Sequence, residues 1–278
     1  MKTTLVIATI TLCVLLALAA WLWTPDKPRA DLERDYLASP ADLITVAGTR
    51  LHLRDTGPRG APVVVVLLLL HGFGASLHTW EPWAVALAAS HRVIRFDLPG
   101  SGLSAPDATG DYTDARSLQL LAALLDQLGV AQASGVGNSI GGRIAWKFAA
   151  AYPQRVSKLV LISPDGFASS GFAYGKPAEV PAVMGLMRYA LPKPLLRMNL
   201  TPAYAQPGRL LDATVTRYHD LMLAPGSRDA LLARMRQTVL EDPLPILRRI
   251  RAPTRRPRPP LSTPLRPDTE RLALTTAH

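Results

Sequence analysis

Cysteine is almost absent from this sequence, and so is a second long apolar run. The one cysteine is Cys13, so no disulfide can form within the chain and the fold must be held by its apolar core. Beyond the first 23 residues, the most continuous apolar stretch is residues 63–70, which is far too short to cross a bilayer as a helix. The 278 residues are enough for one large α/β domain or two smaller ones.

Acidic residues are also few relative to basic ones. The 31 Lys and Arg residues outnumber the 21 Asp and Glu residues, which gives a formal net charge of +10. A basic surplus can indicate nucleic acid or anionic lipid as a partner. Here the arginines are scattered except at the C-terminus, and no nucleic-acid-binding motif accompanies them. We therefore predict no nucleic-acid partner.

Residues 5–23 form the one stretch that could cross a membrane. Only Thr9 and Thr11 are polar there, and as a helix the stretch would be roughly 28 Å long, close to the thickness of a hydrocarbon core. Trp21 and Trp23 stand at its far end, where interfacial aromatic residues are common. The sequence predicts a membrane helix at the N-terminus.

The first 42 residues are divided by composition. We predict an uncleaved signal anchor over residues 1–24, which would place the remainder in the periplasm or another extracytoplasmic space. Ala17-Leu18-Ala19 is a possible signal-peptidase site, which leaves open a cleaved signal peptide and a secreted protein. Residues 25–42 are polar and contain prolines, so a linker is expected there.

We predict one α/β domain over residues 43–254. Strand and helix patterns alternate over its first part, residues 43–166, as in a mostly parallel α/β sheet with helices on both faces. The expected strands are 43–46, 51–54, 63–70, 92–96, a short strand before residue 139, and 158–162, and the expected helices are 80–89, 113–128 and 142–151.

From about residue 167 to 242 the strand patterns stop, and helices are expected near 182–191 and 229–240. We predict a helical cap over the carboxyl edge of the sheet, where open α/β sheets bind ligands, with a separate helical domain as the alternative. Aromatic and methionine side chains could line a pocket under this cap or simply pack it against the core; they are Phe172, Tyr174, Met184, Met187 and Tyr189.

The most informative motif is Gly137-Asn138-Ser139-Ile140-Gly141, which follows a strand pattern and opens a helix pattern. A G-x-S-x-G sequence at such a junction is typical of a nucleophile elbow, a sharp turn that exposes a serine hydroxyl above the sheet. A glycine-rich loop that happens to contain a serine is the alternative.

Together with two further motifs, this elbow makes the chain resemble the α/β-hydrolase family over about residues 43–254. His71-Gly72-Phe73-Gly74 is similar to the family's oxyanion loop, and the residues from Asp97 to Ser104 are similar to its D-x-P-G-x-G-x-S loop. The resemblance implies that Ser139 is the nucleophile and that the oxyanion is bound by the backbone N–H groups of Ile140 and Phe73, with Gly74 the next candidate. It implies that His71 orients the loop and is not the base.

The resemblance also limits the chemistry. It implies a small-molecule ester or similar acyl substrate, with no cofactor and no metal ion. Serine at position 139 disfavours dehalogenation, for which related enzymes carry aspartate. Two alternatives remain open, namely hydrolysis of a carbon–carbon bond and a non-catalytic protein that binds an apolar ligand.

The family's acid and histidine should follow residue 254, but the sequence there has neither in a suitable setting. Residues 255–278 are rich in arginine and proline, which cannot form a central strand, so a disordered tail is expected. Asp268 and His278 are in the required order but only ten residues apart. A divergent terminus and a changed reading frame after Thr254 would each explain this tail. Either way, we predict poor stability and impaired activity.

Overall fold

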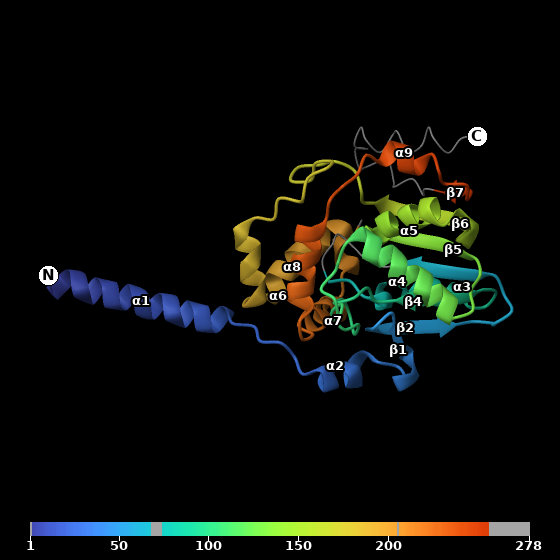
Figure 1. Cartoon of the computed structure of the whole chain (residues 1–278). Coiled ribbons are helices and arrows are strands. Elements are labelled where there is room, and N and C mark those ends of the chain that lie inside the picture. Colours follow the sequence, from blue (N-terminus) through green and yellow to red (C-terminus); the bar gives the residue numbers. More distant parts are fainter. Residues whose placement is uncertain (1, 68–73, 205, 256–278) are drawn as a thin grey trace.

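A computed structural model describes residues 2–67, 74–204 and 206–255. One seven-stranded sheet organises the chain, in the order β1-β2-β4-β3-β5-β6-β7 (Figure 1). Its strands are β1 (Leu43–Val46), β2 (Thr49–Thr56), β3 (Val63–Leu67), β4 (Arg92–Phe96), β5 (Ala133–Ser139), β6 (Val156–Pro164) and β7 (Thr254–Arg255). β2 pairs antiparallel with β1 and β4, and all other pairings are parallel. The predicted mostly parallel α/β sheet is confirmed.

Both faces of the sheet are covered, because successive strand residues are apolar and point to opposite sides. In β4, Ile94 belongs to the larger core with α4 (Asp114–Gln127) and α5 (Ile140–Ala151), whereas Val93 packs with Leu77 and Trp80 near α3 (Glu81–Leu87). The strand at 92–96 is as predicted. The helix expected at 80–89 is α3, which is shorter than expected. A short 3₁₀ helix, η2 (Leu77–Trp80), precedes it.

Both ends of helix α4 carry residues that are typical of helix ends. The side chain of Thr113 caps its N-terminus by accepting a hydrogen bond of 3.2 Å from the Arg116 N–H. Gly129, with φ +64°, follows the helix and adopts the left-handed conformation that ends helices. Between these ends, leucines at helical spacing are buried: Leu120, Leu121, Leu124 and Leu125.

Residues 167–242 lie over one end of the sheet (Figure 1) and contain the short 3₁₀ helices η5 (Thr201–Ala203) and η6 (Pro207–Arg209) together with four longer helices. These are η4 (Ala182–Arg188), α6 (Lys193–Leu200), α7 (Asp212–Met222) and α8 (Ser227–Gln237); a short helix α9 (Pro243–Leu247) follows them. The helix expected at 182–191 is a 3₁₀ helix that ends at Arg188. Pro192 disfavours helical geometry at Leu191, the residue directly before it. We call residues 167–242 the cap.

Helix α1 (Lys2–Leu22) projects from the domain on the cap side (Figure 1), and none of its residues is buried. The following segment is not the free linker we expected. It contains α2 (Arg29–Tyr36), whose Leu32 is buried against Leu103, Leu221 and Ala224. One buried leucine in an otherwise polar helix leaves no signal in composition, which is why this helix was missed.

The described part of the chain ends in β7, a two-residue strand that pairs with Leu159 and Val160 of β6. Residues 256–278, with Asp268 and His278, lie outside the described residues, so our expectations for this tail remain predictions.

Candidate active site

Ser139 occupies the turn between β5 and α5 in a strained backbone conformation. Its φ is 51° and its ψ is −124°, and only two other described residues that are not glycine have positive φ. Such a conformation costs of the order of 1–3 kcal/mol in a residue with a side chain, and it persists only where the surroundings impose it. The strand-to-helix turn that the G-x-S-x-G motif predicts is therefore present at Ser139.

Two glycines provide the space for this turn. A Cβ atom added to Gly137 would lie 2.4 Å from the Gly141 carbonyl oxygen and 2.7 Å from the Gly142 Cα. A Cβ added to Gly142 would lie 2.9 Å from the Cα of Pro164, at the end of β6. The contacts are with backbone that cannot swing aside, so the first turn of α5 can lie this close to β5 and β6 only because both residues lack side chains.

The end of β6 is tied to the same turn. The Asp165 N–H donates a 3.1 Å hydrogen bond to the Ser139 carbonyl oxygen, and the Asp165 carboxylate lies 3.2 Å from a nitrogen of the Arg143 guanidinium. Arg143 is buried and also lies 3.2 Å from a carboxylate oxygen of Asp114. The backbone carbonyl of Asp165 accepts a 3.1 Å bond from the Trp146 indole. These contacts fix α5, and with it the position of Ser139.

The expected oxyanion loop is only partly visible. His71, Gly72 and Phe73 lie outside the described residues, so the proposed donor at Phe73 stays a prediction. Gly74 is described and has φ +55°; a Cβ there would lie 2.2 Å from the Met222 side chain, at the end of α7. The loop that precedes η2 thus lies directly against the cap.

The D-x-P-G-x-G-x-S loop is built around the buried carboxylate of Asp97. This carboxylate accepts hydrogen bonds from the Leu77 N–H at 2.6 Å and the Leu103 N–H at 3.0 Å, and lies 2.7 Å from His52 Nδ1. Gly102 is required because a Cβ would lie 2.1 Å from the carboxylate. The Asp97–His52 pair was not anticipated from the sequence. Both side chains are fully buried, so we assign the pair to holding the loop.

None of the four described histidines is bonded to Ser139. Besides His52, His78 bonds Ser76 and a backbone carbonyl, and His91 bonds Ser90. His219 bonds the Leu191 carbonyl oxygen at 2.8 Å, within the cap. His71 and His278 complete the six histidines of the chain and lie outside the described residues. The described part of the chain therefore positions a serine at the elbow but no base beside it.

The cap side chains that we expected at the substrate pocket do not all face inward. Tyr174 and Tyr189 are exposed, and Tyr189 stacks on Trp23. Phe172, Met184 and Met187 are partly exposed. The exposure of the two tyrosines does not favour a place in a pocket wall, whereas the other three side chains fit either alternative.

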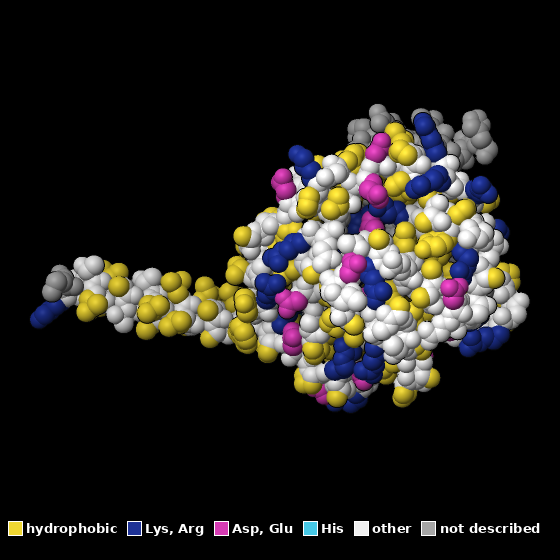
Figure 2. Space-filling view, viewed as in Figure 1, with side chains coloured by type: hydrophobic (Ala, Val, Ile, Leu, Met, Phe, Trp, Pro, Cys, Tyr) yellow, Lys and Arg dark blue, Asp and Glu magenta, His cyan; other side chains and the backbone are white. Residues whose placement is uncertain are grey.

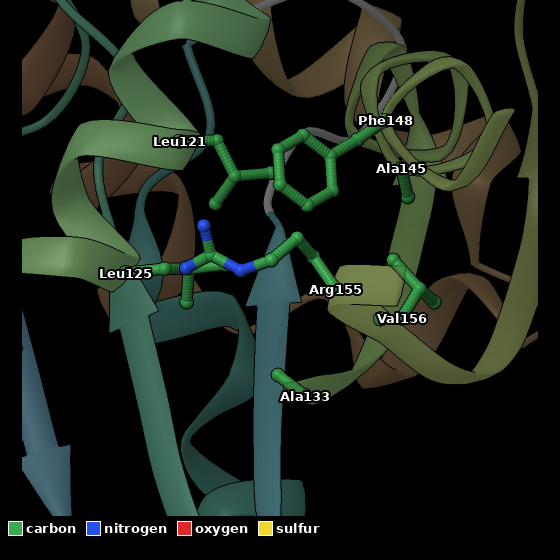
Figure 3. Close-up of a pocket in the computed structure, with 8 residues that line it drawn as sticks. Leu121, Leu125, Ala133, Ala145, Phe148, Arg155 and Val156 are labelled. Atoms are coloured by element: carbon green, nitrogen blue, oxygen red, sulfur yellow. The ribbon is translucent and has the colours of Figure 1, made fainter. Parts of the chain in front are cut away.

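Three hollows in the described part of the chain are not lined by Ser139. A cavity of about 20 Å³ between α4, α5 and the beginning of β5 is lined by Ala133 and Phe148 among others (Figure 3). Ser139 is six residues further along β5, roughly 20 Å away. A second void, of about 10 Å³, lies beside Gly74. An open surface groove of about 600 Å³ lies between α2 and α7, near Arg54.

Among the described residues, no group of three or more His, Cys, Asp or Glu side chains could hold a metal ion.

Known proteins are similar to this chain in sequence. The acetyltransferase component of the acetoin cleaving system from Cupriavidus necator is 35% identical over 153 residues, which is 54% of this chain and 40% of that protein. A 2-hydroxymuconate semialdehyde hydrolase from a Pseudomonas species is 34% identical over 172 residues, or 61% of this chain and 52% of the relative. The chain thus spans about half, or less, of the length of these curated relatives.

A solved structure has the same fold. The meta-cleavage product hydrolase from Pseudomonas fluorescens superposes with a TM-score of 0.63 at 23% identity, covering 77% of each chain. The family model for the alpha/beta hydrolase fold matches residues 65–209, which include the loop that begins at Asp97, the elbow at Ser139 and the end of β6. Since this match covers more than half of the chain, the protein belongs to the alpha/beta hydrolase fold family.

Proposed function

We propose that this protein is a serine hydrolase in which Ser139 attacks the carbonyl carbon of a small-molecule acyl substrate. The observation that carries the proposal is the strained backbone of Ser139, at a strand-to-helix turn that Gly137 and Gly142 make possible. In a nucleophile elbow, such a strained turn exposes the serine hydroxyl above the sheet, as attack on a substrate requires. A turn without a catalytic role has no need for this strain. The family and its hydrolase relatives support the proposal.

The acyl-transfer steps follow from this geometry. As the Ser139 oxygen bonds to the carbonyl carbon, its proton passes to a base and the carbonyl oxygen becomes an oxyanion. The N–H group of Ile140, the first residue of α5, would donate to that oxyanion, helped by the positive end of the helix. We propose the Phe73 N–H as the second donor. Collapse of the intermediate expels the leaving group, and water then releases the acyl group from the serine.

The base decides how fast this reaction runs. The four described histidines are all bonded elsewhere. Of the other two, His71 is expected to orient the oxyanion loop, so His278 is the remaining histidine candidate in this sequence. In serine hydrolases, loss of the histidine lowers kcat by a factor on the order of 10⁶. We therefore expect impaired turnover if neither histidine reaches Ser139.

A fluorophosphonate probe tests the proposal on the full-length protein in detergent. We expect a covalent adduct at Ser139, located by mass spectrometry and abolished by Ser139→Ala. Ser163→Ala is the matched control, because Ser163 also has positive φ, 42°, and ends the neighbouring strand; this variant should still be labelled. Folded protein without an adduct would instead favour the alternative of a non-catalytic, ligand-binding relative.

A carbon–carbon bond hydrolase is the second candidate, and the relative named for 2-hydroxymuconate semialdehyde favours it. The same nucleophile and oxyanion donors would serve both reactions. Parallel assays with a p-nitrophenyl ester and with 2-hydroxymuconate semialdehyde separate the candidates. Ester turnover that Ser139→Ala abolishes would support our first proposal, whereas consumption of the semialdehyde alone would replace it.

We also propose that α1 anchors the protein in a membrane, with the catalytic domain on the extracytoplasmic side. The length and apolar composition of α1 support this, as does the exposure of its whole surface. The full-length protein should stay in the membrane pellet after alkaline carbonate and be digested by protease added to spheroplasts. A shortened chain in the soluble fraction would indicate a cleaved signal peptide instead.

A further inference from the structure

The cap carries a cluster of apolar side chains that are open to solvent. Among the described residues after the first 23, ten large apolar side chains are exposed, and eight of these belong to the cap. Five lie between residues 183 and 198, with 49% to 65% of each side chain exposed; they are Val183, Leu186, Tyr189, Leu195 and Met198. We call these five residues the cap face. Single exposed apolar residues are ordinary, but such a concentration indicates a partner.

The two elements that carry the cap face have the wrong composition for a surface in water. Five of the seven residues of η4 are apolar, yet none is buried. Helix α6 is apolar on both sides, because Leu196 and Leu200 are buried while Leu195 and Met198 are exposed. A surface helix normally presents polar residues to water. The outward side of α6 combines Leu195 and Met198 with the exposed Lys193 and Asn199, a mixture that suits the surface of a membrane.

The cap face adjoins the end of α1. Trp23 stacks on Tyr189 with ring centroids 5.7 Å apart, and the backbone of Trp23 forms a bridge with Ala190. The Thr24 N–H donates a 2.7 Å hydrogen bond to the Tyr189 carbonyl oxygen. Figure 2 shows hydrophobic side chains continuing from α1 onto the domain where the two meet. A bilayer crossed by α1 would thus meet this part of the cap first.

This junction is bonded on several sides. The buried Arg228 guanidinium donates to the Thr24 carbonyl oxygen at 2.7 Å and to the Asp26 carboxylate at 2.6 Å. The Lys27 N–H bonds the Leu223 carbonyl oxygen at 2.8 Å, and its ammonium group lies 2.8 Å from the Asp220 carboxylate. Because the chain after α1 is held to α7 and α8, the cap cannot swing freely about the end of the helix.

We infer that the cap face lies in the lipid headgroup and upper acyl region of the bilayer that α1 spans. This inference rests on the membrane anchor proposed above. Tryptophan at the end of a membrane helix resides at the interface, and Tyr189 stacks directly on Trp23. Apolar side chains of membrane-surface helices enter about 5–10 Å into this boundary.

Immersion of the cap face would bring the elbow close to lipid. Helix α6 packs against α7, and the last residue of α7, Met222, meets Gly74. Helices α6 and α7 thus connect the cap face to Gly74, which belongs to the loop expected to bind the oxyanion. The substrate class that fits this placement is an amphiphilic ester drawn from the leaflet.

Site-specific fluorescence tests the placement on the full-length chain, without depending on catalysis. Leu186→Cys, Met198→Cys and Val85→Cys are made in a Cys13→Ala background and labelled with a nitrobenzoxadiazole dye. Val85 is the matched control, since it is 70% exposed and equally apolar but belongs to α3, on the side of the sheet away from α1 (Figure 1). The native protein, labelled at Cys13, reports on α1 itself.

The labelled proteins are reconstituted into phosphatidylcholine–phosphatidylglycerol vesicles with and without brominated acyl chains. We expect brominated lipid to quench the labels at positions 186 and 198 at least about twofold, and the label at position 85 not at all. Quenching at Cys13 with none at 186 and 198 would overturn the inference and leave the anchor intact. No quenching at Cys13 would remove the anchor and the inference together. A blue shift at 186 and 198 that disappears on dilution, without quenching, would assign the cap face to a second copy of the chain.

Discussion

Substitution of Gly137 by alanine should break the turn that holds Ser139, and the magnitude follows from the geometry. Neither Gly137 nor Gly135 has positive φ, so the cost of a side chain at each position is steric. At Gly137 the added Cβ lies 2.4 Å from a carbonyl oxygen of the backbone. Overpacking typically costs 1–3 kcal/mol, and we expect about 3 kcal/mol or more here, since the contact is with backbone on a helix held by buried ion pairs.

Gly135 provides the control within the same strand. A Cβ there would meet a single atom closely, Cδ1 of Leu159 at 3.3 Å, which is the far end of a flexible side chain. Gly135→Ala should therefore change the free energy of unfolding by less than about 1 kcal/mol. Both substitutions add one methyl group to β5, so their difference isolates the contact at Gly137.

Thermal unfolding of the full-length protein in detergent, followed by tryptophan fluorescence, measures this difference. For a domain of this size 1 kcal/mol corresponds to about 2–4 °C in Tm. We expect Gly137→Ala to lower the Tm by about 6 °C or more, or to prevent folding, and to abolish fluorophosphonate labelling of Ser139. Gly135→Ala should stay within about 4 °C of wild type. If Gly137→Ala melts with Gly135→Ala and still labels, the elbow does not depend on close backbone contact and the reasoning fails.

Three further predictions concern stability. Burial lowers the pKa of His78 to about 4 from its ordinary value of about 6.5, so the unfolded chain binds more protons than the folded chain between these two pH values. The free energy of unfolding should therefore be full above pH 6.5 and fall by up to about 3 kcal/mol toward pH 4. Urea unfolding at a series of pH values measures this dependence, which His78→Gln should remove. Leu124→Ala, in the core under α4, should cost about 2–5 kcal/mol in denaturant titrations, whereas the exposed Gln127→Ala of the same helix should cost almost nothing. Arg143→Met leaves the Asp165 carboxylate without its guanidinium partner, while Asp114 keeps an ion pair with Lys147, and should cost about 1–3 kcal/mol. Arg34→Ala removes an exposed ion pair and should leave the free energy of unfolding nearly unchanged by calorimetry. Equal costs for the two arginines would contradict this account.

The sheet could be predicted from sequence where side-chain periodicity was decisive. Residues 92–96 are strand β4 in full. Its apolar residues Val93, Ile94 and Phe96 carry the strand pattern, although two of its five buried residues are arginines. The cap was harder to predict because tertiary contacts decide its helices. Helix α6 has only eight residues and a proline near its start, and its exposed side carries Leu195 and Met198, so its apolar residues do not mark the buried face alone. Helix α2 depends on one leucine that packs against residues far away in sequence.

In the candidate site, too, the features that depend on neighbouring residues were predictable and those that depend on distant residues were not. A serine between glycines at a strand-to-helix junction predicts its own strained turn, because that information is local to residues 137–142. The role of Asp97 was not predictable from its motif alone. Its partners His52 and Leu77 are distant in sequence, and only the paired strands bring them together. The activating base is a long-range feature of this kind, and pattern alone does not supply it.

The carboxylate of Asp97 has a consequence for the order in which the chain folds. Its three partners lie 45, 20 and 6 residues away, so only the contact with Leu103 can form locally. The contacts with His52 and Leu77 require strand β2 and the segment after β3 to arrive first, and each closes a loop with an entropic cost. We therefore expect the three hydrogen bonds to this carboxylate to form late in folding and to break together. The amide protons of Leu77 and Leu103 should accordingly exchange with solvent at one common rate in the native state.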